Sequence, residues 1–406
     1  MRLLLWVWLP TRLLIWWRRL DVPTHPPSPL KPKSFIIFRL DALGDLVLTT
    51  PLFRELKRAY PRARITVAMQ EAYRSILTTN PNIDEVLTLP VIRMRWLPAH
   101  ARRLLSVLLF YRRELRERRF DVAISPRWDT DEHLATLLCL LTNAGTRIGY
   151  SERASPGKRR YNRGFDRAFD ICLTPGPLQH EVERNLSIVE ALGARVREKH
   201  IEVHLTSEDR EYARGVLKEA PEASILIALG IGAQSPGRRW PIERYAAVVG
   251  ELAQQHPVYA VITCAPSEHA EAARLARLLP VSALISDSPK VRESCALLAS
   301  CDLFLGNDTG AAHLAAAMRL PTIVISRHPR SGDPAHPNSP ARFSPWCASS
   351  RVLQPWRGRD GCASRCTHVE PHCIKKVTTA EAVLAAKAML MQVEHTRDKL
   401  ALSLSL

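Results

Sequence analysis

Several motifs of large functional classes are absent from this sequence of 406 residues. It has no G-x-G-x-x-G fingerprint, no paired C-x2-C and no tandem repeat. Nor does it contain a zinc finger or another nucleic-acid-binding module. These absences give no support to a dinucleotide-binding protein, a repeat protein or a nucleic-acid-binding protein.

Acidic side chains are scarce relative to basic ones. Asp and Glu number 40 against 57 Lys and Arg, which leaves a formal net charge of +17. Most of this charge is typical of a solvated basic surface, but the excess also predicts an anionic partner. Since no nucleic-acid module accompanies it, we expect a membrane surface or a phosphorylated substrate.

No apolar run near the N-terminus is long enough to span a bilayer, because Leu3–Leu9 ends at Pro10. No small-residue cleavage site follows, so a secretory signal is not expected. Met1–Leu20 combines Trp with Arg, which predicts a segment lying on anionic lipid. The alternative is an amphipathic helix packed on the protein itself. The proline-rich stretch Asp21–Lys33 then predicts a linker.

Cysteine is present in an odd number, nine, and part of it is clustered. The cluster consists of Cys347, Cys362, Cys366 and Cys373, with His368 and His372 among them. C-x3-C with nearby His is compatible with zinc. The lack of a paired C-x2-C favours a local disulfide or free thiols, and the sequence leaves these alternatives open.

Short apolar, β-branched runs alternate with helical patterns in two successive series, each of which predicts a parallel sheet. We expect a first domain over 34–195, a second over 196–393, and a tail at 394–406, after the segment 1–33. Ser151–Phe169 is rich in Arg and Gly and is predicted to be a mobile basic loop. The predicted strands are Ser34–Leu40, Ile65–Met69, Glu85–Leu89, Asp121–Ser125, Arg147–Tyr150, Ile225–Leu229, Val258–Cys264, Ala283–Ile285, Leu303–Leu305 and Leu320–Ser326.

The stretch Cys301–Ser326 predicts a compact strand-turn-helix-strand unit. Its polar turn follows a strand, where open α/β sheets bind ligands. Asp308 and Thr309 can cap the helix that starts near Gly310, and free N–H groups there favour a phosphate. His313 lies one turn further on. The alternative is a capped helix without a ligand.

Two further turns follow predicted strands. In Arg39–Asp45, Gly44 permits a tight turn, and Asp45 is either a helix cap or a general base in the cleft. In Gly230–Pro241, backbone N–H groups, Arg238 and Arg239 can approach a phosphate. The alternative is a surface loop anchored by its Trp-Pro pair.

Together these stretches resemble glycosyltransferase family 9, the lipopolysaccharide heptosyltransferases. RLDALGDLVLTTPLFRELKRAYP is similar to the N-terminal signature of that family. LFLGNDTGAAHLAAAMRLPTIVI is similar to its C-terminal nucleotide-binding signature. Arg238 begins a Trp-Pro motif of the family type, and His180–Gly193 resembles the stretch between its two domains. The resemblance runs from about Phe35 to Val393 and leaves out Met1–Leu20.

The resemblance implies an α/β protein with the GT-B fold, in which two Rossmann-like domains with parallel sheets face each other across a cleft. It implies inverting transfer of a heptose, typically from ADP-heptose, to a lipopolysaccharide core or lipid A-linked acceptor. No metal or other cofactor is implied for catalysis. The implied partners are the nucleotide sugar, an anionic lipid-linked glycan and the inner face of the cell membrane, in the cytoplasm and without nucleic acid. Nothing in the resemblance specifies an oligomeric state.

The family's functional residues map onto individual positions of this chain. The resemblance implies that Asp45 is the base that deprotonates the acceptor hydroxyl. It implies that Arg238 holds the diphosphate and stabilises the leaving-group charge. The remaining implied substrate-binding residues are Asp41, Gly44, Glu268, Asp308, Thr309, Gly310 and His313.

Two departures from the family pattern bear on the donor. Many members have Lys where this chain has Arg238, and the two side chains differ in reach and geometry. Many also have Ser-Ser where this chain has Asp41 and Ala42, which adds a carboxylate near the phosphates. Transfer of another nucleotide-activated sugar to a surface glycan is therefore an alternative. A non-catalytic nucleotide-sugar-binding protein of the same fold is a second one.

Overall fold

The computed structural model describes residues 32–404 apart from 95, 175, 289, 360, 361 and 363–369, with side chains as far as 392. The segment Met1–Leu20, predicted to lie on lipid, falls outside the described residues. The chain divides into two units, Met1–Lys199 and His200–Leu406. Among the described residues, no helix combines the length and the apolar character needed to cross a membrane.

The first unit is built on a six-stranded parallel sheet with the strand order β3-β2-β1-β4-β5-β6. The central strand β1 is formed by an unbroken apolar run, and its residues Phe35–Phe38 are fully buried. Parallel strands covered on both faces require such runs, so the prediction of this sheet is confirmed. The strands are β1 (Ser34–Phe38), β2 (Arg64–Gln70), β3 (Glu85–Leu89), β4 (Val122–Ser125), β5 (Thr146–Tyr150) and β6 (Ile171–Leu173).

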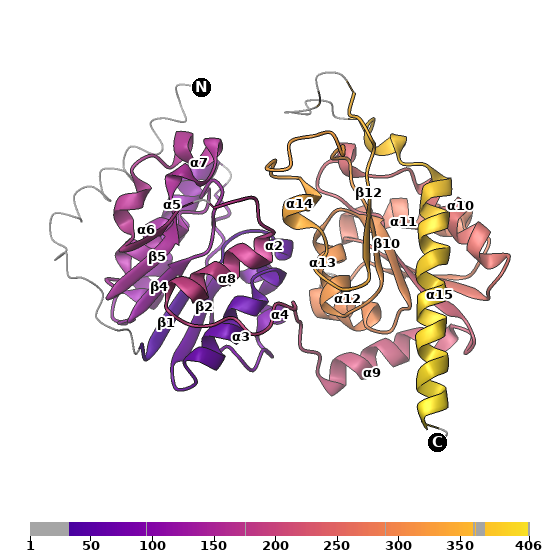
Figure 1. The fold of residues 1–406 in the computed structure, drawn as a ribbon, viewed down its shortest axis with the longest axis horizontal. Helices are drawn as coiled ribbons and strands as arrows, with labels where there is room; N and C mark the ends of the chain where they lie inside the picture. The colour runs from indigo at the N-terminus through magenta and orange to yellow at the C-terminus, as the bar shows by residue number, and fades with distance from the viewer. Residues whose placement is uncertain are drawn as a thin grey trace. The chain divides into compact units, whose positions relative to one another are not determined.

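The helices of the first unit flank its sheet (Figure 1). They are α2 (Leu43–Val47), α3 (Thr50–Ala59), α4 (Arg74–Leu77), α5 (Ala99–Phe110), α6 (Ala135–Leu141), α7 (Pro156–Tyr161) and α8 (Glu181–Ala191). Single 3-10 turns are η2 (Glu71–Tyr73), η4 (Glu152–Ala154) and η5 (Phe165–Ala168), and η3 (Tyr111–Leu115) is a π-helical extension of α5. Pro51 lies in the first turn of α3, where proline is favoured because the N–H that it lacks would have no partner in the helix.

The prediction that Ser151–Phe169 is a loop is wrong. This stretch forms η4, α7 and η5, and Lys158 and Phe165 are buried in it. The stretch has too few apolar residues to show a helical pattern in the sequence, and its helices are held by polar contacts instead. Ser155, for example, caps α7 by accepting a hydrogen bond of 3.1 Å from the Lys158 N–H.

The second unit repeats the architecture, with the order β12-β11-β10-β7-β8-β9, again all parallel. Its strands are β7 (Ile225–Gly230), β8 (Val258–Thr263), β9 (Ala283–Ser286), β10 (Leu303–Asn307), β11 (Thr322–Ile325) and β12 (Ser350–Leu353). Its helices are α9 (Ser207–Val216), α10 (Ile242–Ala253), α11 (His269–Leu278), α12 (Val291–Leu298), α13 (Gly310–Ala317), α14 (Pro340–Phe343) and α15 (Thr379–Leu404), with 3-10 turns η6 (Leu217–Glu219), η7 (Pro236–Arg238), η8 (Pro266–Glu268) and η9 (Ile374–Lys376).

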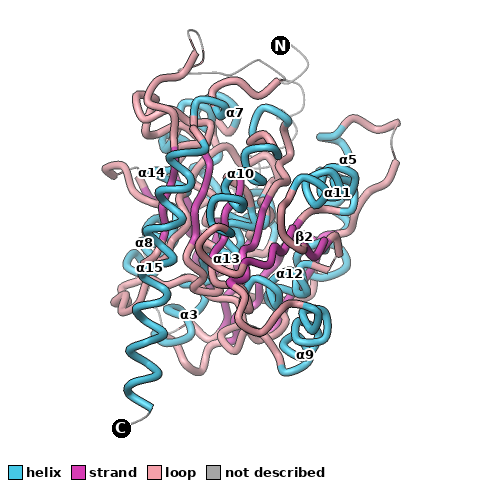
Figure 2. Tube along the Cα trace, turned by 90° about the vertical axis from the view of Figure 1, so that its right-hand side faces the viewer, coloured by secondary structure: helices cyan, strands magenta, loops and turns pink. Residues whose placement is uncertain are grey.

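The last helix of the second unit is longer than the sequence suggests. α15 begins at Thr379 and continues to Leu404, through most of the expected tail 394–406 (Figure 2). Ala382, Ala386 and Leu390 recur at every fourth position and pack in the same core as α10 and the sheet. Burying a side chain of Leu size contributes about 1.5–3 kcal/mol to folding, so this face anchors the helix.

Both sheets have the strand order of a doubly wound fold, which reverses direction at one point. In the first unit this switch point lies between β1 and β4, and in the second between β7 and β10. Because loops after these strand pairs diverge to opposite faces, ligands of such sheets bind at the carboxyl ends there. All the turns singled out from the sequence follow β1, β7 or β10.

Candidate functional site

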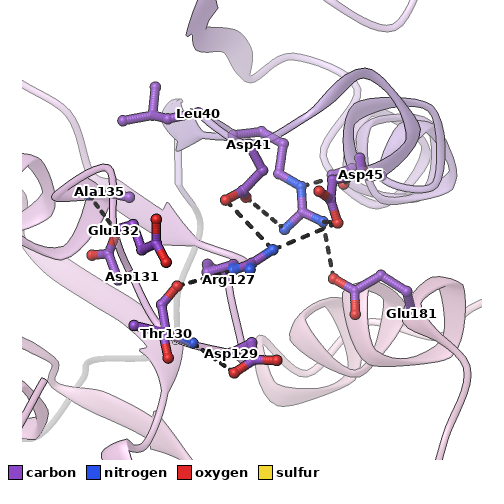
Figure 3. Close-up of polar contacts among 12 residues, drawn as sticks. Leu40, Asp41, Asp45, Arg127, Asp129, Thr130, Asp131, Glu132, Ala135 and Glu181 are labelled. Atoms are coloured by element: carbon purple, nitrogen blue, oxygen red, sulfur yellow. Dashed lines mark hydrogen bonds and ion pairs between the residues drawn. The ribbon is translucent and has the colours of Figure 1, made fainter. Parts of the chain in front are cut away.

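Each unit carries a polar cluster at its switch point. In the first unit, the residues that follow β1 meet those that follow β4, because the two strands are neighbours in the sheet. Figure 3 shows the side chains of Asp41, Asp45 and Arg127 directed toward one another, with Glu181 reaching in from α8. We call Arg39, Asp41, Asp45, Arg127 and Glu181 the acidic cluster.

Arg39 lies at the centre of this cluster and is buried. Its guanidinium contacts Glu181 at 2.9 Å, Asp45 at 3.3 Å and Asp41 at 3.4 Å. Its Nε also donates a hydrogen bond of 3.2 Å to the Asp45 carbonyl. A buried guanidinium is stable only when it is paired, so Arg39 fixes the positions of these three carboxylates.

Arg127 approaches the same carboxylates from the loop after β4. Its NH1 lies 3.5 Å from Asp41 and 3.6 Å from Asp45. The Arg127 backbone is held in turn by Lys158, whose Nζ donates a hydrogen bond of 2.7 Å to the Arg127 carbonyl. Burial lowers the pKa of Lys158 to about 8. The acidic cluster thus contains three carboxylates and two guanidinium groups, with the Lys158 ammonium against the Arg127 backbone.

The proton affinity of the cluster is concentrated on Asp45. Burial raises the pKa of Asp45 above its ordinary value; Arg39 and Arg127 only partly offset this, and Asp41 and Glu181 add to it. Burial also acts on Asp41, but Arg127 and Arg39 bring the pKa of that carboxyl below its ordinary value. Two nearby carboxyl groups with displaced pKa values are typical of acid–base sites.

The helix-cap interpretation of Asp45 is wrong. The short helix α2 begins at Leu43, so Asp45 lies within its first turn instead of preceding it. Its carboxylate pairs with Arg39 and Arg127. The structure does not place Gly44 in a turn, and its predicted part in substrate binding stays a prediction. Gly44 lies inside α2, and it is not among the described glycines with positive φ.

Two carboxylates near the cluster have structural roles that the sequence analysis did not single out. The run Asp129-Thr130-Asp131 has D-x-D spacing, but Asp131 accepts hydrogen bonds from the first N–H groups of α6, those of Ala135 and Thr136. These hydrogen bonds hold the first turn of α6, which starts at Ala135. The Asp129 carboxylate accepts a hydrogen bond of 2.8 Å from the Ser155 hydroxyl.

In the second unit, the turn after β10 meets the loop after β7. Arg238 NH2 lies 3.1 Å from Asp308 Oδ2 and donates a hydrogen bond of 2.5 Å to the Asp308 carbonyl. Both side chains remain partly exposed, at 24% and 19%. The structure therefore brings together two of the residues singled out from the sequence, and Asp308 orients the guanidinium beside the start of α13.

The start of α13 is uncapped by side chains within the described residues. Thr309 occupies the position before the helix, and Gly310 is its first residue. The expectation that Asp308 and Thr309 cap this helix is wrong, because no capping hydrogen bond from a side chain is found there. Its first N–H groups, next to Arg238, form an arrangement suited to a phosphate. His313, one turn along α13, is buried.

Asn307 connects the two loops, and the sequence analysis missed it. It is fully buried at the end of β10. Its amide donates hydrogen bonds of 2.7 Å to the Ile231 carbonyl and 3.3 Å to that of Gly232, and its oxygen accepts 3.0 Å bonds from the Trp240 N–H and the Tyr245 hydroxyl. Trp240 is itself buried, which confirms its predicted anchoring role. Asn307 thus fixes the loop after β7 on both sides of Arg238 and so determines the position of that arginine.

Glu268 and Arg239 stabilise the loop after β7. Glu268 accepts a 3.2 Å hydrogen bond from the Ala233 N–H and pairs with Arg239 at 2.9 Å. Arg239 also pairs with Glu271 at 2.9 Å, so its donors are engaged within the protein, contrary to the expected phosphate contact. A side chain at Gly232 would collide with the Glu268 carboxylate, so that carboxylate would have to leave its present position.

The sequence motifs contain Asp45 and Arg238 but not the residues that hold the Asp45 cluster in place. Arg127, Lys158 and Glu181 are distant in sequence from the motif after β1, and only the strand order brings them to it. Asp45 belongs to the first unit and the turn at Asp308 to the second, and the expectation that both line one cleft stays a prediction.

Known proteins of one family are similar to this chain. The family described as glycosyltransferase family 9 (heptosyltransferase) matches residues 109–338. A curated relative, lipopolysaccharide heptosyltransferase 3 of Escherichia coli, is 27% identical over 323 residues, which cover 78% of this chain and 86% of the relative.

Solved structures of the family share the fold. A glycosyltransferase family 9 protein from Veillonella parvula aligns with a TM-score of 0.70 at 19% identity, covering 91% of this chain and 99% of that one. The ADP-heptose lps heptosyltransferase II of E. coli aligns with a TM-score of 0.63 at 19% identity, covering 89% of this chain and 99% of that one. The two parallel sheets are those of the GT-B fold, as expected. The family match extends over more than half of the sequence, and the chain belongs to glycosyltransferase family 9, the heptosyltransferase family.

Proposed function

We propose that this enzyme transfers a heptose from ADP-heptose to a lipopolysaccharide core or lipid A-linked acceptor, with inversion at the anomeric carbon. The observation that carries the proposal is the Asp45 carboxyl, which has a raised pKa and lies at the carboxyl end of β1 between two guanidinium groups. A carboxylate with this property is a more effective general base near neutral pH than an ordinary aspartate.

In the proposed reaction, Asp45 takes the proton of an acceptor hydroxyl while that oxygen attacks the anomeric carbon of the donor. The new glycosidic bond forms as the bond between the anomeric carbon and the diphosphate oxygen breaks. The electron pair of the broken bond leaves with ADP. Since attack and departure occur on opposite faces, the configuration inverts. Arg39 and Arg127 hold the carboxylate in place and keep it from leaving the cluster.

The second unit supplies the donor side in this proposal. Arg238 binds the diphosphate and stabilises the negative charge that develops on it as the sugar leaves. Thr309, Gly310 and the first N–H groups of α13 bind the same phosphates, with His313 one turn beyond them. Asp308 orients Arg238, and Glu268 holds the loop that contacts the nucleoside.

The net positive charge of the chain supports the proposed acceptor and the proposed location. A net charge of +17 attracts an anionic, lipid-linked glycan and the anionic surface that carries it. We therefore place the enzyme in the cytoplasm, peripherally bound to the inner face of the cell membrane. The segment Met1–Leu20, with its Trp and Arg residues, is the part of the chain assigned to this surface.

A second candidate is transfer of another nucleotide-activated sugar, and Asp41 favours it. This carboxyl pairs with Arg39 and Arg127, which lower its pKa, so it carries a charge at neutral pH. A fixed negative charge near a diphosphate disfavours donors that bring their phosphates close to it. The departure from the family pattern at Asp41 therefore keeps another nucleotide-activated sugar as a candidate.

A donor screen separates the two candidates. The full-length protein is incubated with a heptose-deficient lipopolysaccharide and, in parallel, with ADP-heptose and with nucleotide-activated hexoses. Product masses are then measured. A mass increase of one heptose with ADP-heptose alone supports the proposal, whereas addition of a hexose at a higher kcat/KM overturns it in favour of the second candidate.

A further inference from the structure

The described part of the cysteine cluster converges with a histidine. Cys362, His372 and Cys373 place their ligand atoms within 4.8 Å of one another. Cys362 Sγ lies 3.7 Å from His372 Nε2. No disulfide joins two of the described cysteines. Cys366 and His368 lie outside the described residues, and the site argued below does not use them.

The backbone around this group is held in a defined shape. The Cys362 N–H donates a hydrogen bond of 2.9 Å to the Arg359 carbonyl, which closes a turn. The Arg359 N–H donates a hydrogen bond of 3.2 Å to Cys373 Sγ. This hydrogen bond holds the sulfur of Cys373 next to the residues that precede Cys362.

The two adjacent ligands are anchored in the core. Cys373 is buried, and Ile374 and Val377, which follow it in and after η9, belong to the core of the second unit. The Lys376 ammonium donates hydrogen bonds of 3.1 Å to the carbonyls of Arg357 and Gly358. These contacts tie the turn that carries Cys362 to the segment that carries the other two ligands, so the site does not depend on a single loop.

We propose that Cys362, His372 and Cys373 bind a divalent metal ion of the zinc class. Two thiolates and one imidazole are soft and borderline ligands, which zinc prefers over carboxylate oxygen. On binding, each thiol releases its proton to solvent, and no oxidation or reduction takes place. A fourth ligand completes the tetrahedral shell of the ion.

A disulfide between Cys362 and Cys373 would use the same two sulfur atoms. It would leave the imidazole without a role, although His372 Nε2 points at Cys362 Sγ at 3.7 Å. The convergence of three different donors on one point therefore favours a metal over a disulfide. The two alternatives have opposite signatures in metal content and in free-thiol count.

The position of the site indicates a structural role. The cavity that Cys362, His372 and Cys373 line is also lined by Gly237 and His328. Gly237 precedes Arg238 in η7. All three proposed ligands follow β12, so a metal here would hold the residues around Cys362 and Cys373 together beside the loop after β7 that carries Arg238, while taking no part in the transfer itself.

The test uses the full chain, purified under reducing conditions with a tag free of histidine. Zinc is measured by elemental analysis after dialysis, and free thiols are titrated in parallel. We expect about one equivalent of zinc per chain in the wild type. Loading of chelated protein with Co²⁺ should give sulfur-to-cobalt charge-transfer absorption. In Cys362→Ser, His372→Ala and Cys373→Ser, retained zinc should fall by roughly tenfold or more.

The matched control is Cys347→Ser, a half-buried cysteine of the same unit that is not one of the three ligands. It should retain the metal content of the wild type. Circular dichroism establishes that each variant is folded. If Cys373→Ser fails to fold because that residue is buried, Cys362→Ser decides. A wild type without zinc or Co²⁺ absorption overturns the proposal, as does a Cys362–Cys373 disulfide found by mass or a Cys347→Ser variant that loses zinc equally.

Discussion

The carboxyl groups of Asp41 and Asp45 contact the same two guanidinium groups, yet their pKa values are displaced in opposite directions. Burial acts on both. Arg127 and Arg39 bring the pKa of Asp41 below its ordinary value. In Asp45, burial prevails and raises the pKa, and repulsion from Asp41 and Glu181 raises it further. One neighbour thus stays ionised while the other can exchange a proton in the reaction.

The first prediction concerns Arg127. Replacing it with Met removes a cation that lowers the pKa of Asp45, so this pKa should rise further. The base works only when deprotonated. Activity should therefore increase with pH through this pKa, and the acidic limb of the profile of kcat/KM against pH should move to higher pH in Arg127→Met.

The control for this change is Arg74→Met, which removes an exposed arginine of the same unit. Its profile should coincide with that of the wild type. An Arg127→Met profile that keeps its acidic limb in place, or moves it to lower pH, would show that the limb does not report Asp45.

The second prediction is a shift of the acidic limb in the opposite direction, to lower pH. Asp41→Ser replaces a charged neighbour with the hydroxyl residue that many family members carry. Since Asp41 raises the pKa of Asp45, its removal should move the acidic limb to lower pH. Loss of the negative charge should also lower the KM for ADP-heptose. A KM that rises instead would mean that the Asp41 carboxylate contributes to donor binding.

The third prediction addresses the contact between Arg238 and Asp308. Arg238→Ala should lower kcat by about 10²–10³-fold, the usual effect of removing a group that stabilises developing charge. Arg238→Lys keeps the charge and should retain much more activity, although its reach differs. Arg277→Ala, an exposed change in the same unit, serves as the control. Equal losses in Arg238→Ala and Arg238→Lys would indicate that the forked shape matters more than the charge.

The fourth prediction concerns stability. Asn307→Ala leaves the Ile231 carbonyl and the Trp240 N–H without their side-chain partner in a buried position. Each lost partner costs about 1–3 kcal/mol, so the free energy of unfolding should fall by roughly 3 kcal/mol. Tyr245→Phe removes only one hydroxyl bond to Asn307 and should cost about 1 kcal/mol. Denaturant unfolding measures both, and equal costs would contradict the central role of Asn307.

The sequence predicts the fold in the core better than at the edges. Buried parallel strands such as β1 and β10 are continuous apolar runs, so their position follows from composition alone. The strands β6 and β12 lie at sheet edges, are short and only partly buried, and were missed. Their formation depends on the neighbouring strand that pairs with them, which local sequence does not reveal.

The residues of the candidate site also fall into two groups, those that the sequence predicts and those that only the fold reveals. Asp45 and Arg238 are found because they lie in local motifs beside a strand end. Arg127 and Glu181 are separated from Asp45 by more than 80 residues in sequence, and only the adjacency of β1 and β4 and the position of α8 bring them together. Asn307 looks like an ordinary strand-end residue until its hydrogen bonds are seen.

The most direct test of the central claim, that Asp45 is the base of a heptosyl transfer, combines a transfer assay with donor binding. Wild type, Asp45→Ala and the isosteric Asp45→Asn are compared for product mass with ADP-heptose and a heptose-deficient lipopolysaccharide, and for ADP affinity by calorimetry. We predict that both variants bind ADP as the wild type does, while kcat falls by about 10²–10⁴-fold, the contribution of a general base. Near-normal turnover in Asp45→Asn, with a folded protein and unchanged ADP affinity, would contradict the claim.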